Sequence, residues 1–241
     1  MHVAAVLCVG RVQTRRIGKH TAQDGQLDAV IAIGVVMALQ ATLATVSRVN
    51  DWNIWGFPGW LWLVVIVPEF LLLLALRVHI RKHGTEQMGR RRLISLAMVT
   101  VIVTVNVAAL IVLIGSLLSG QEVSGGQLLF KALTIWSTNV VAFGLLFWDR
   151  DAGGPVARRR DPDKRDRAFS FPQMQNPELA PDGWHPRLYD YIYISFTNSI
   201  AFSPTDVMPL THRAKAGMML ESAISATTVL LAAARAVNIL R

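Results

Sequence analysis

Charge and cysteine are both scarce in this sequence. Of its 241 residues, 17% are charged and 52% are hydrophobic, whereas about 25% of residues are charged in an ordinary soluble domain. The mean hydropathy of the whole chain is +0.39. Cys8 is the single cysteine, so neither an intrachain disulfide nor a cysteine zinc cluster can form. These features exclude a soluble enzyme and a secreted disulfide-stabilised domain, and they indicate a chain that resides in a lipid bilayer.

The common catalytic and cofactor motifs are also missing. The sequence has no Gly-rich phosphate loop, no HExxH, no GxSxG and no protein-kinase motif set. His79 and His83 have the i, i+4 spacing of zinc ligands on one helix face, but Arg81 and Lys82 lie between them and no third ligand is evident. This pattern favours simple solvation at the membrane surface. We therefore expect no enzymatic activity, no cofactor and no bound metal.

Long apolar runs dominate what the sequence does contain. A helix needs about 20 mostly apolar residues to cross about 30 Å of hydrocarbon. Four runs reach this length easily, and a fifth near the C-terminus includes Lys215, Glu221 and Arg235. A sixth run, 187–203, has 17 residues, which is at the lower limit for a span. The predicted spans are 27–47, 58–80, 93–118, 127–148, 187–203 and 214–240.

The positions of Lys and Arg predict how these spans are oriented. Loops on the cytoplasmic side carry an excess of Lys and Arg. Basic residues gather in three segments: 11–19, 77–92 and 150–167. The loops on the other side contain one basic residue, Arg48. The three basic segments are therefore expected to be cytoplasmic, and with six spans both chain termini are cytoplasmic as well.

Residues 149–186 differ in composition from the apolar runs. They contain six of the ten prolines and the mixed-charge run RRRDPDKRDR, which cannot bury enough surface to fold alone. Asp161, Asp163 and Asp166 resemble a divalent-cation site, but the interleaved Lys and Arg favour a solvated linker. The predicted organisation is a cytoplasmic tail, a four-helix membrane region, a cytoplasmic loop and a C-terminal membrane region: 1–26, 27–148, 149–186 and 187–241.

Four polar side chains are predicted to lie near the centre of the bilayer. Glu69 is eleven residues into its span, about 16 Å at about 1.5 Å per residue. Asn106, Asn139 and Asn198 fall at a similar depth in three other spans. Ionisable residues within lipid are costly and are usually functional or paired. We interpret this layer as a permeation or proton site with Glu69 at its centre, and interhelical hydrogen bonding is the alternative.

Two charged residues in other spans are predicted to form a structural pair. Lys131 and Glu221 both fall roughly a third of the way into the membrane from the outer face. Charged residues inside a membrane usually pair with one another or with backbone carbonyls. We expect a structural ion pair between these two side chains rather than a role in transport.

The last third of the chain has a recognisable order of segments. Residues 193–198 (YISFTN) and 206–211 (DVMPLT) precede an apolar helix with an early glutamate. This order resembles the pore region of two-helix bacterial potassium channels. The chain is also similar to uncharacterised bacterial multi-pass membrane proteins that share segments like FWDRDAGGP (147–155) and FSPTD (202–206). The resemblance implies a pore helix, a filter, an inner helix and a homo-oligomer in a bacterial inner membrane.

The segment at the filter position departs from the channel pattern. It consists of Ala201, Phe202, Ser203, Pro204, Thr205 and Asp206. Filter glycines allow the backbone to turn its carbonyls toward a pore. Ser203 and Thr205 replace them here, and Pro204 fixes its own φ. The linker before a channel pore helix is also external, whereas the basic residues predict a cytoplasmic one. Selective potassium conduction of the familiar kind is therefore not expected.

The sequence predicts one fold class, in two variants, and two alternative functions. The fold is an all-α polytopic transmembrane bundle with six spans, or with five spans and a re-entrant pore-like loop. The function is that of an ion or small-solute channel or transporter, or that of a non-catalytic membrane scaffold or regulator. The expected partners are the lipid bilayer and further copies of the chain. Nucleic acid is not expected, because the basic clusters flank apolar runs.

Overall fold

Long apolar helices make up most of the structure. The computed structural model describes residues 27–52, 66–71, 73–74, 88–118, 125–160, 167–203 and 206–239. Within these residues, four helices are long and apolar enough to cross a membrane: Leu27–Val49, Leu93–Gly115, Gly125–Gly153 and His212–Ala234. A helix satisfies its own backbone hydrogen bonds, which lipid cannot do. The prediction of a helical membrane bundle is confirmed at this level.

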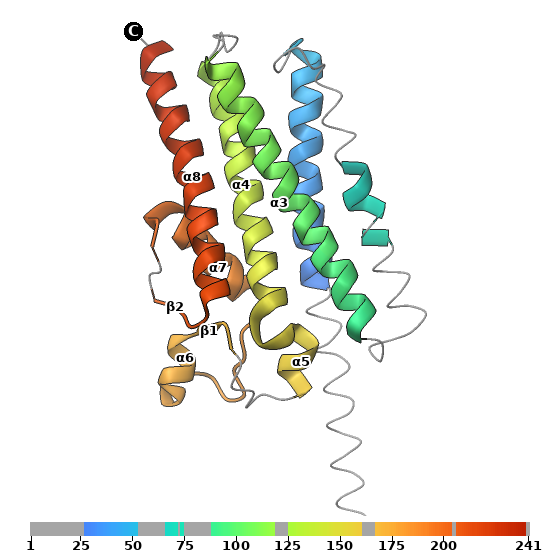
Figure 1. Cartoon of the computed structure of the whole chain (residues 1–241), viewed down its shortest axis with the longest axis vertical. Helices are drawn as coiled ribbons and strands as arrows, with labels where there is room; N and C mark the ends of the chain where they lie inside the picture. Colours follow the sequence, from blue (N-terminus) through green and yellow to red (C-terminus); the bar gives the residue numbers. More distant parts are fainter. Residues whose placement is uncertain are drawn as a thin grey trace, which may run out of the picture.

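The elements are labelled as in Figure 1. The long helices are α3 (Met88–Leu118), α4 (Gly125–Arg150) and α8 (His212–Ile239), beside the helix Leu27–Val49. Between α4 and α8 the elements are a 3-10 turn (Asp151–Gly153), α5 (Pro155–Arg160), β1 (Phe169–Ser170), α6 (Pro172–Gln175), a second 3-10 turn (Pro177–Leu179), α7 (Leu188–Ala201) and β2 (Met208–Pro209).

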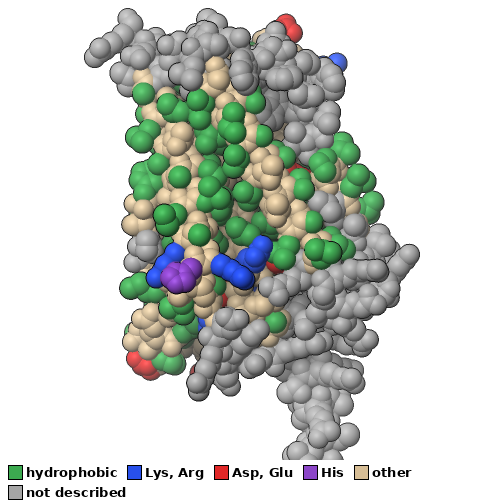
Figure 2. Space-filling view, in the orientation of Figure 1, with side chains coloured by type: hydrophobic (Ala, Val, Ile, Leu, Met, Phe, Trp, Pro, Cys, Tyr) green, Lys and Arg blue, Asp and Glu red, His purple; other side chains and the backbone are tan. Residues whose placement is uncertain are grey.

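The helix α4 occupies the middle of the bundle. It packs against α3, α7 and α8, and most of its side chains are buried. The outer surface of the long helices is largely apolar, and Figure 2 shows Lys, Arg and His side chains gathered toward the end at which α8 begins. An apolar exterior with cations at one end fits a lipid environment, because charged side chains are expensive in hydrocarbon.

The helix α7 extends only partway along the bundle. Its 14 residues measure about 21 Å at about 1.5 Å per residue, which is short of the roughly 30 Å that a span needs. It ends at Phe202, whose backbone is left-handed with φ 54°. The chain then returns to the end from which α7 started (Figure 1). There β2 pairs with β1, Phe169 opposite Pro209, and the amide of Leu210 donates to the carbonyl of Ala168 (2.8 Å).

This return path differs from the predicted six spans. Residues 187–203 were expected to cross the membrane, but β2 brings the chain back to the end of the bundle at which α4 finishes. The described residues include four helices that could span a membrane, so six spans and five spans with a re-entrant loop both stay predictions. Because α8 runs the length of the bundle, its C-terminal end lies at the opposite end of the bundle from the start of the helix Leu27–Val49 (Figure 1). The predicted cytoplasmic placement of both termini stays a prediction.

Several sequence predictions fall on residues that are outside the described part of the chain. They are the tail 1–26, the aspartates of 161–166, and His79 and His83. Of the predicted span 58–80, only residues 66–71 and 73–74 are described, and they are helical. The structure does not test these predictions.

Cysteine labelling in cells tests the return path. In a Cys8→Ser background, we expect cysteines at Met208 and at Asp182 to react with an impermeant thiol reagent from the same side of the membrane. A cysteine at Val49 is expected to react from the other side. Met208 and Val49 are 60% and 76% exposed and Asp182 is also exposed, so all three positions are accessible. A Met208 cysteine that reacts from the same side as the Val49 cysteine would show that residues 187–203 cross the membrane.

Candidate functional site

A network of buried polar side chains crosses the bundle at the middle of α4. Asn139 is fully buried, and its Oδ1 accepts a hydrogen bond from Nδ2 of Asn106 on α3 (3.2 Å). Its own Nδ2 donates to Oγ of Ser225 (2.9 Å) and to the carbonyl of Glu221 (3.3 Å), both on α8. Two of the predicted asparagines therefore contact each other directly and join three helices.

The side chain of Glu221 extends this network to α7. Its Oε1 is hydrogen-bonded to the hydroxyl of Ser195, and its Oε2 accepts from Nδ2 of Asn198 (2.7 Å). The same amide group of Asn198 donates to the carbonyl of Met218 (3.0 Å), and the hydroxyl of Ser195 lies 2.7 Å from the carbonyl of Val140 on α4. The third predicted asparagine thus belongs to the same network, with Glu221 as its direct partner.

Glu69 has a different partner. It is fully buried, and its Oε1 accepts a hydrogen bond from Nε2 of Gln40 on the helix Leu27–Val49 (3.0 Å). Among the described residues, neither Oε2 of Glu69 nor Oε1 of Gln40 has a hydrogen-bond partner. A protonated carboxyl has one O–H donor, which an ionised carboxylate lacks. Gln40 was missed from the sequence, although a lone amide inside an apolar run was the available signal.

Lys131 lies near the start of α4, before Asn139, and is buried. Its ammonium group is 5.9 Å from the centroid of the Trp52 ring, which is a cation–π distance. Eight residues separate Lys131 from Asn139, or about 12 Å along the helix at about 1.5 Å per residue. Both carboxyl oxygens of Glu221 already contact α7. The predicted pairing of Lys131 with Glu221 therefore stays a prediction.

The filter-like segment begins at the end of α7. Ala201, Phe202, Ser203 and Asp206 are exposed on the surface of the chain, and Pro204 and Thr205 are outside the described residues. The described residues of this segment therefore do not line the interior of the bundle.

The depth of this segment follows from the contacts of Asn198, one turn before the end of α7. Asn198 donates to the carbonyl of Met218, and the hydroxyl of Ser222 donates to the carbonyl of Asn198 (3.4 Å). These two partners lie near the middle of the apolar span His212–Ala234 of α8. The left-handed residue Phe202 therefore lies close to the central level of that span.

A sharp corner follows α4, within the segment FWDRDAGGP. Ala152, Gly153 and Gly154 have φ values of 47°, 81° and 94°. Residues other than glycine rarely adopt such positive φ values. A Cβ on Gly154 would lie 3.0 Å from the carbonyl oxygen of Asp149. The corner also contacts α3, because the hydroxyl of Ser95 on α3 donates a hydrogen bond to Oδ1 of Asp149 (2.9 Å). The two glycines therefore serve to turn the chain back under the bundle.

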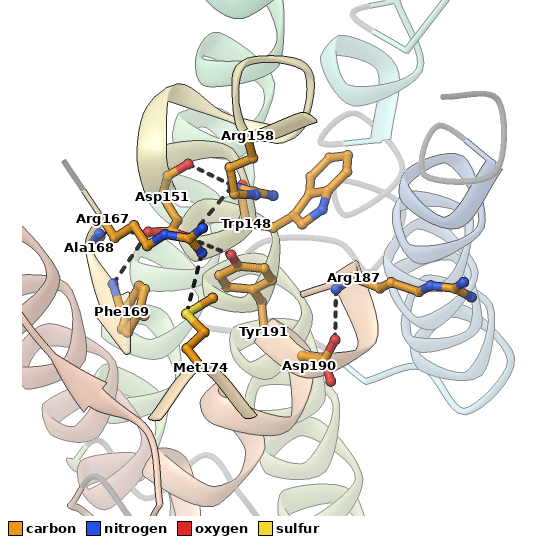
Figure 3. A network of polar contacts seen from close by, with 10 residues as sticks. All are labelled: Trp148, Asp151, Arg158, Arg167, Ala168, Phe169, Met174, Arg187, Asp190 and Tyr191. Atoms are coloured by element: carbon orange, nitrogen blue, oxygen red, sulfur yellow. Dashed lines mark hydrogen bonds and ion pairs between the residues drawn. The ribbon is translucent and has the colours of Figure 1, made fainter. Parts of the chain in front are cut away.

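This corner carries a buried carboxylate that the sequence analysis did not single out (Figure 3). Oδ1 of Asp151 accepts from the amides of Ala168 (2.6 Å) and Phe169 (3.3 Å), and Oδ2 accepts from the hydroxyl of Tyr191 (2.6 Å). Nη1 of Arg158 donates to the carbonyl of Asp151 (2.6 Å). Asp151 therefore joins the end of α4, the strand β1 and the helix α7.

Aromatic packing encloses the Asp151 carboxylate. The rings of Phe169 and Phe171 contact the ring of Tyr191 edge to face, at centroid distances of 6.2 Å and 5.3 Å. Desolvation by burial raises the pKa of the Tyr191 phenol well above its usual range. The phenol therefore stays protonated and able to donate to Asp151 at neutral pH. The arrangement is that of a structural anchor, because the hydrogen bonds of this carboxylate tie the end of α4 to β1 and α7.

The polar groups described at these sites are mainly amides, hydroxyls and carboxyls, which hydrogen-bond to one another and to the backbone. Within the described ranges, no group of three or more His, Cys, Asp or Glu side chains is placed to hold a metal ion. Comparison of the chain with protein-family models, with curated proteins and with solved structures finds no match.

Proposed function

We propose that this membrane protein forms an oligomeric pathway for an ion or a small polar solute. The pathway is lined by the α7–α8 unit, which comprises α7, residues 202–211 and α8. The observation that supports this function is that Phe202 and Ser203 are exposed and not helical, close to the central level of the α8 span. The proposal includes a location in a bacterial inner membrane, with residues 149–186 on the cytoplasmic side.

The physical argument concerns unpaired backbone groups. The last four carbonyls of a helix have no partner within that helix. In hydrocarbon, each such group without a partner costs several kcal/mol. Irregular backbone at membrane depth is tolerated where it is buried in protein or lines a water-filled cavity. Phe202 is 46% exposed in the single chain, so the C-terminal end of α7 lies at the surface of that chain.

An oligomer satisfies this requirement in a simple way. Copies of the α7–α8 unit that surround a common axis cover one another's exposed residues at the end of α7 and leave water along the axis. The resemblance to channel pore regions supports the same arrangement, with a half-length helix ahead of a full-length one. In this arrangement the pathway lies between copies of the chain, whereas the buried polar layer lies inside each copy.

A membrane scaffold or regulator is the second candidate, and the buried network favours it. Asn106, Asn139, Asn198 and Glu221 are at most 2% exposed and bond to one another or to neighbouring backbone. Interhelical hydrogen bonds of this kind contribute about 0.6 kcal/mol each. Such a network fixes helix packing without any transport. A scaffold of this kind predicts a chain that inserts and folds but carries no flux.

Flux through proteoliposomes separates the two candidates. We expect the purified protein to carry K⁺, Na⁺ or proton flux above that of empty vesicles. In a Cys8→Ser background, modification of a Ser203→Cys variant by a charged methanethiosulfonate is expected to reduce this flux at least tenfold, because the label occupies the pathway. Leu179→Cys is the matched control, since Leu179 is exposed on the loop outside the α7–α8 unit.

Absence of flux, or a Ser203→Cys variant that is insensitive to its label, would favour the scaffold. The same assay tests the predicted proton role of Glu69. Glu69→Gln keeps a hydrogen bond with Gln40 and removes the charge change, so we expect the variant to fold normally and to lose the pH dependence of any flux. A fully pH-dependent Glu69→Gln variant would show that this carboxyl has no such role.

A further inference from the structure

We infer that Glu221 is the residue that positions α7, and that it does so as a neutral carboxylic acid clamped between α7, α4 and α8. This inference concerns the α7–α8 unit of the proposed function and rests on that function only for its effect on flux. It assigns to Glu221 a role different from the predicted ion pair with Lys131. The clamp consists of Glu221, Ser195, Asn198 and the carbonyl of Val140.

The dependence of α7 on tertiary contacts comes from its length. Isolated helices shorter than about 12 to 15 residues are marginal in water, and most helical stability in proteins comes from packing. The 14 residues of α7 are held at their start by the bond between Tyr191 and Asp151. Toward the other end, two of the buried polar side chains of α7, Ser195 and Asn198, contact the carboxyl group of Glu221.

The protonation of Glu221 follows from a count of hydrogen atoms. The hydroxyl of Ser195 has one hydrogen, yet its oxygen lies within hydrogen-bond distance of two acceptors, the carbonyl of Val140 and Oε1 of Glu221. Each contact has a hydrogen of its own when the carboxyl supplies one of them, and the alternative is a single hydrogen shared between two acceptors. Oε2 is meanwhile occupied as an acceptor by Nδ2 of Asn198. A protonated Oε1 therefore satisfies every polar atom at this point.

Burial leads to the same protonation state. Glu221 and Ser195 are both 0% exposed, and the two side chains that bond to the carboxyl are neutral. An ionised carboxylate without a cationic partner is very costly in such surroundings. A neutral acid also suits the clamp chemically, because it accepts on one oxygen and donates from the other. A glutamine at this position reproduces both functions, whereas a leucine reproduces neither.

Hydrogen–deuterium exchange of the full chain in detergent, followed by mass spectrometry, tests the clamp. We expect Glu221→Gln to leave exchange of the α7 amides unchanged. Glu221→Leu is expected to accelerate exchange across 188–201 at least tenfold and to leave the central part of α4 unchanged. Glu178→Gln is the matched control, since Glu178 is exposed on the loop before α7, and it is expected to change neither region.

Two results would overturn the inference. Exchange of α7 that is as fast in Glu221→Gln as in Glu221→Leu would show that the charge, rather than the neutral acid, holds the helix. Normal exchange of α7 in Glu221→Leu would show that the residue does not position it. If the leucine variant does not fold, Ser195→Ala removes one contact of the clamp and is expected to accelerate α7 exchange at least threefold. No acceleration in Ser195→Ala would equally contradict the clamp.

These measurements are independent of transport. A protein that carries no flux but shows the expected exchange pattern keeps the clamp and loses the proposed function. A protein that carries flux with unaltered α7 exchange in Glu221→Leu keeps the function and loses the clamp.

Discussion

Replacement of Asp151 by alanine is expected to lower the free energy of unfolding by about 3 to 5 kcal/mol. The Asp151 carboxylate is fully buried and accepts hydrogen bonds from the amides of Ala168 and Phe169 and from the hydroxyl of Tyr191. Without it, three donors at the end of the bundle lose their acceptor where little water reaches them. Unfolding of the purified protein in detergent, by heat or by sodium dodecyl sulfate, measures the loss.

Two further variants show whether the loss comes from these hydrogen bonds. Tyr191→Phe keeps the ring and its aromatic contacts but removes one donor, and we expect it to cost about 1 kcal/mol. Asp182→Ala removes an exposed carboxylate of the same loop, and surface substitutions usually change stability by no more than about 0.5 kcal/mol. An Asp151→Ala protein as stable as Asp182→Ala would show that the amides of β1 find other partners.

Replacement of Gly144 by valine is expected to destabilise the protein by about 2 to 3 kcal/mol, because it forces α7 away from α4. A Cβ at Gly144 would lie 2.9 Å from both Cα and Cγ1 of Ile192 on α7. The Cα atom belongs to the backbone, so a change of rotamer cannot relieve the contact. Thermal unfolding measures the loss, and faster hydrogen exchange of the α7 amides locates it.

The matched control for this substitution is Gly34→Ala in the helix Leu27–Val49. A Cβ at Gly34 has no neighbour within 4 Å, and alanine has a higher helix propensity than glycine by about 1 kcal/mol. We expect this variant to be as stable as the unmodified protein or slightly more stable. A Gly144→Val protein that unfolds like Gly34→Ala would show that α4 and α7 do not approach each other so closely.

The mid-membrane polar layer illustrates how far depth along a span predicts contacts. Asn106, Asn139 and Asn198 were selected because they lie at similar depths, and they do share one network. Depth alone does not tell which helices are neighbours. Glu69 was placed in the same layer for the same reason, yet it accepts a hydrogen bond from Gln40. The rotation and packing order of the helices decide such pairs.

The long spans were determined by the sequence itself. A run such as 27–47 contains enough apolar side chains to favour lipid, and a helix is the backbone form that satisfies its own hydrogen bonds there. Both properties are local, because they depend on the residues of one segment. For this reason the helical bundle could be predicted without knowledge of any contact between segments.

Only the tertiary structure decided that α7 turns back. Its sequence has almost the length and hydropathy of a span, and nothing local distinguishes a short span from a half-length helix. The decision lies in contacts between distant residues: β2 pairs with β1, Tyr191 bonds to Asp151 across 40 positions, and Glu221 bonds to Asn198 across 23. These contacts exist only after the chain has folded, because their strength depends on burial that no single segment provides.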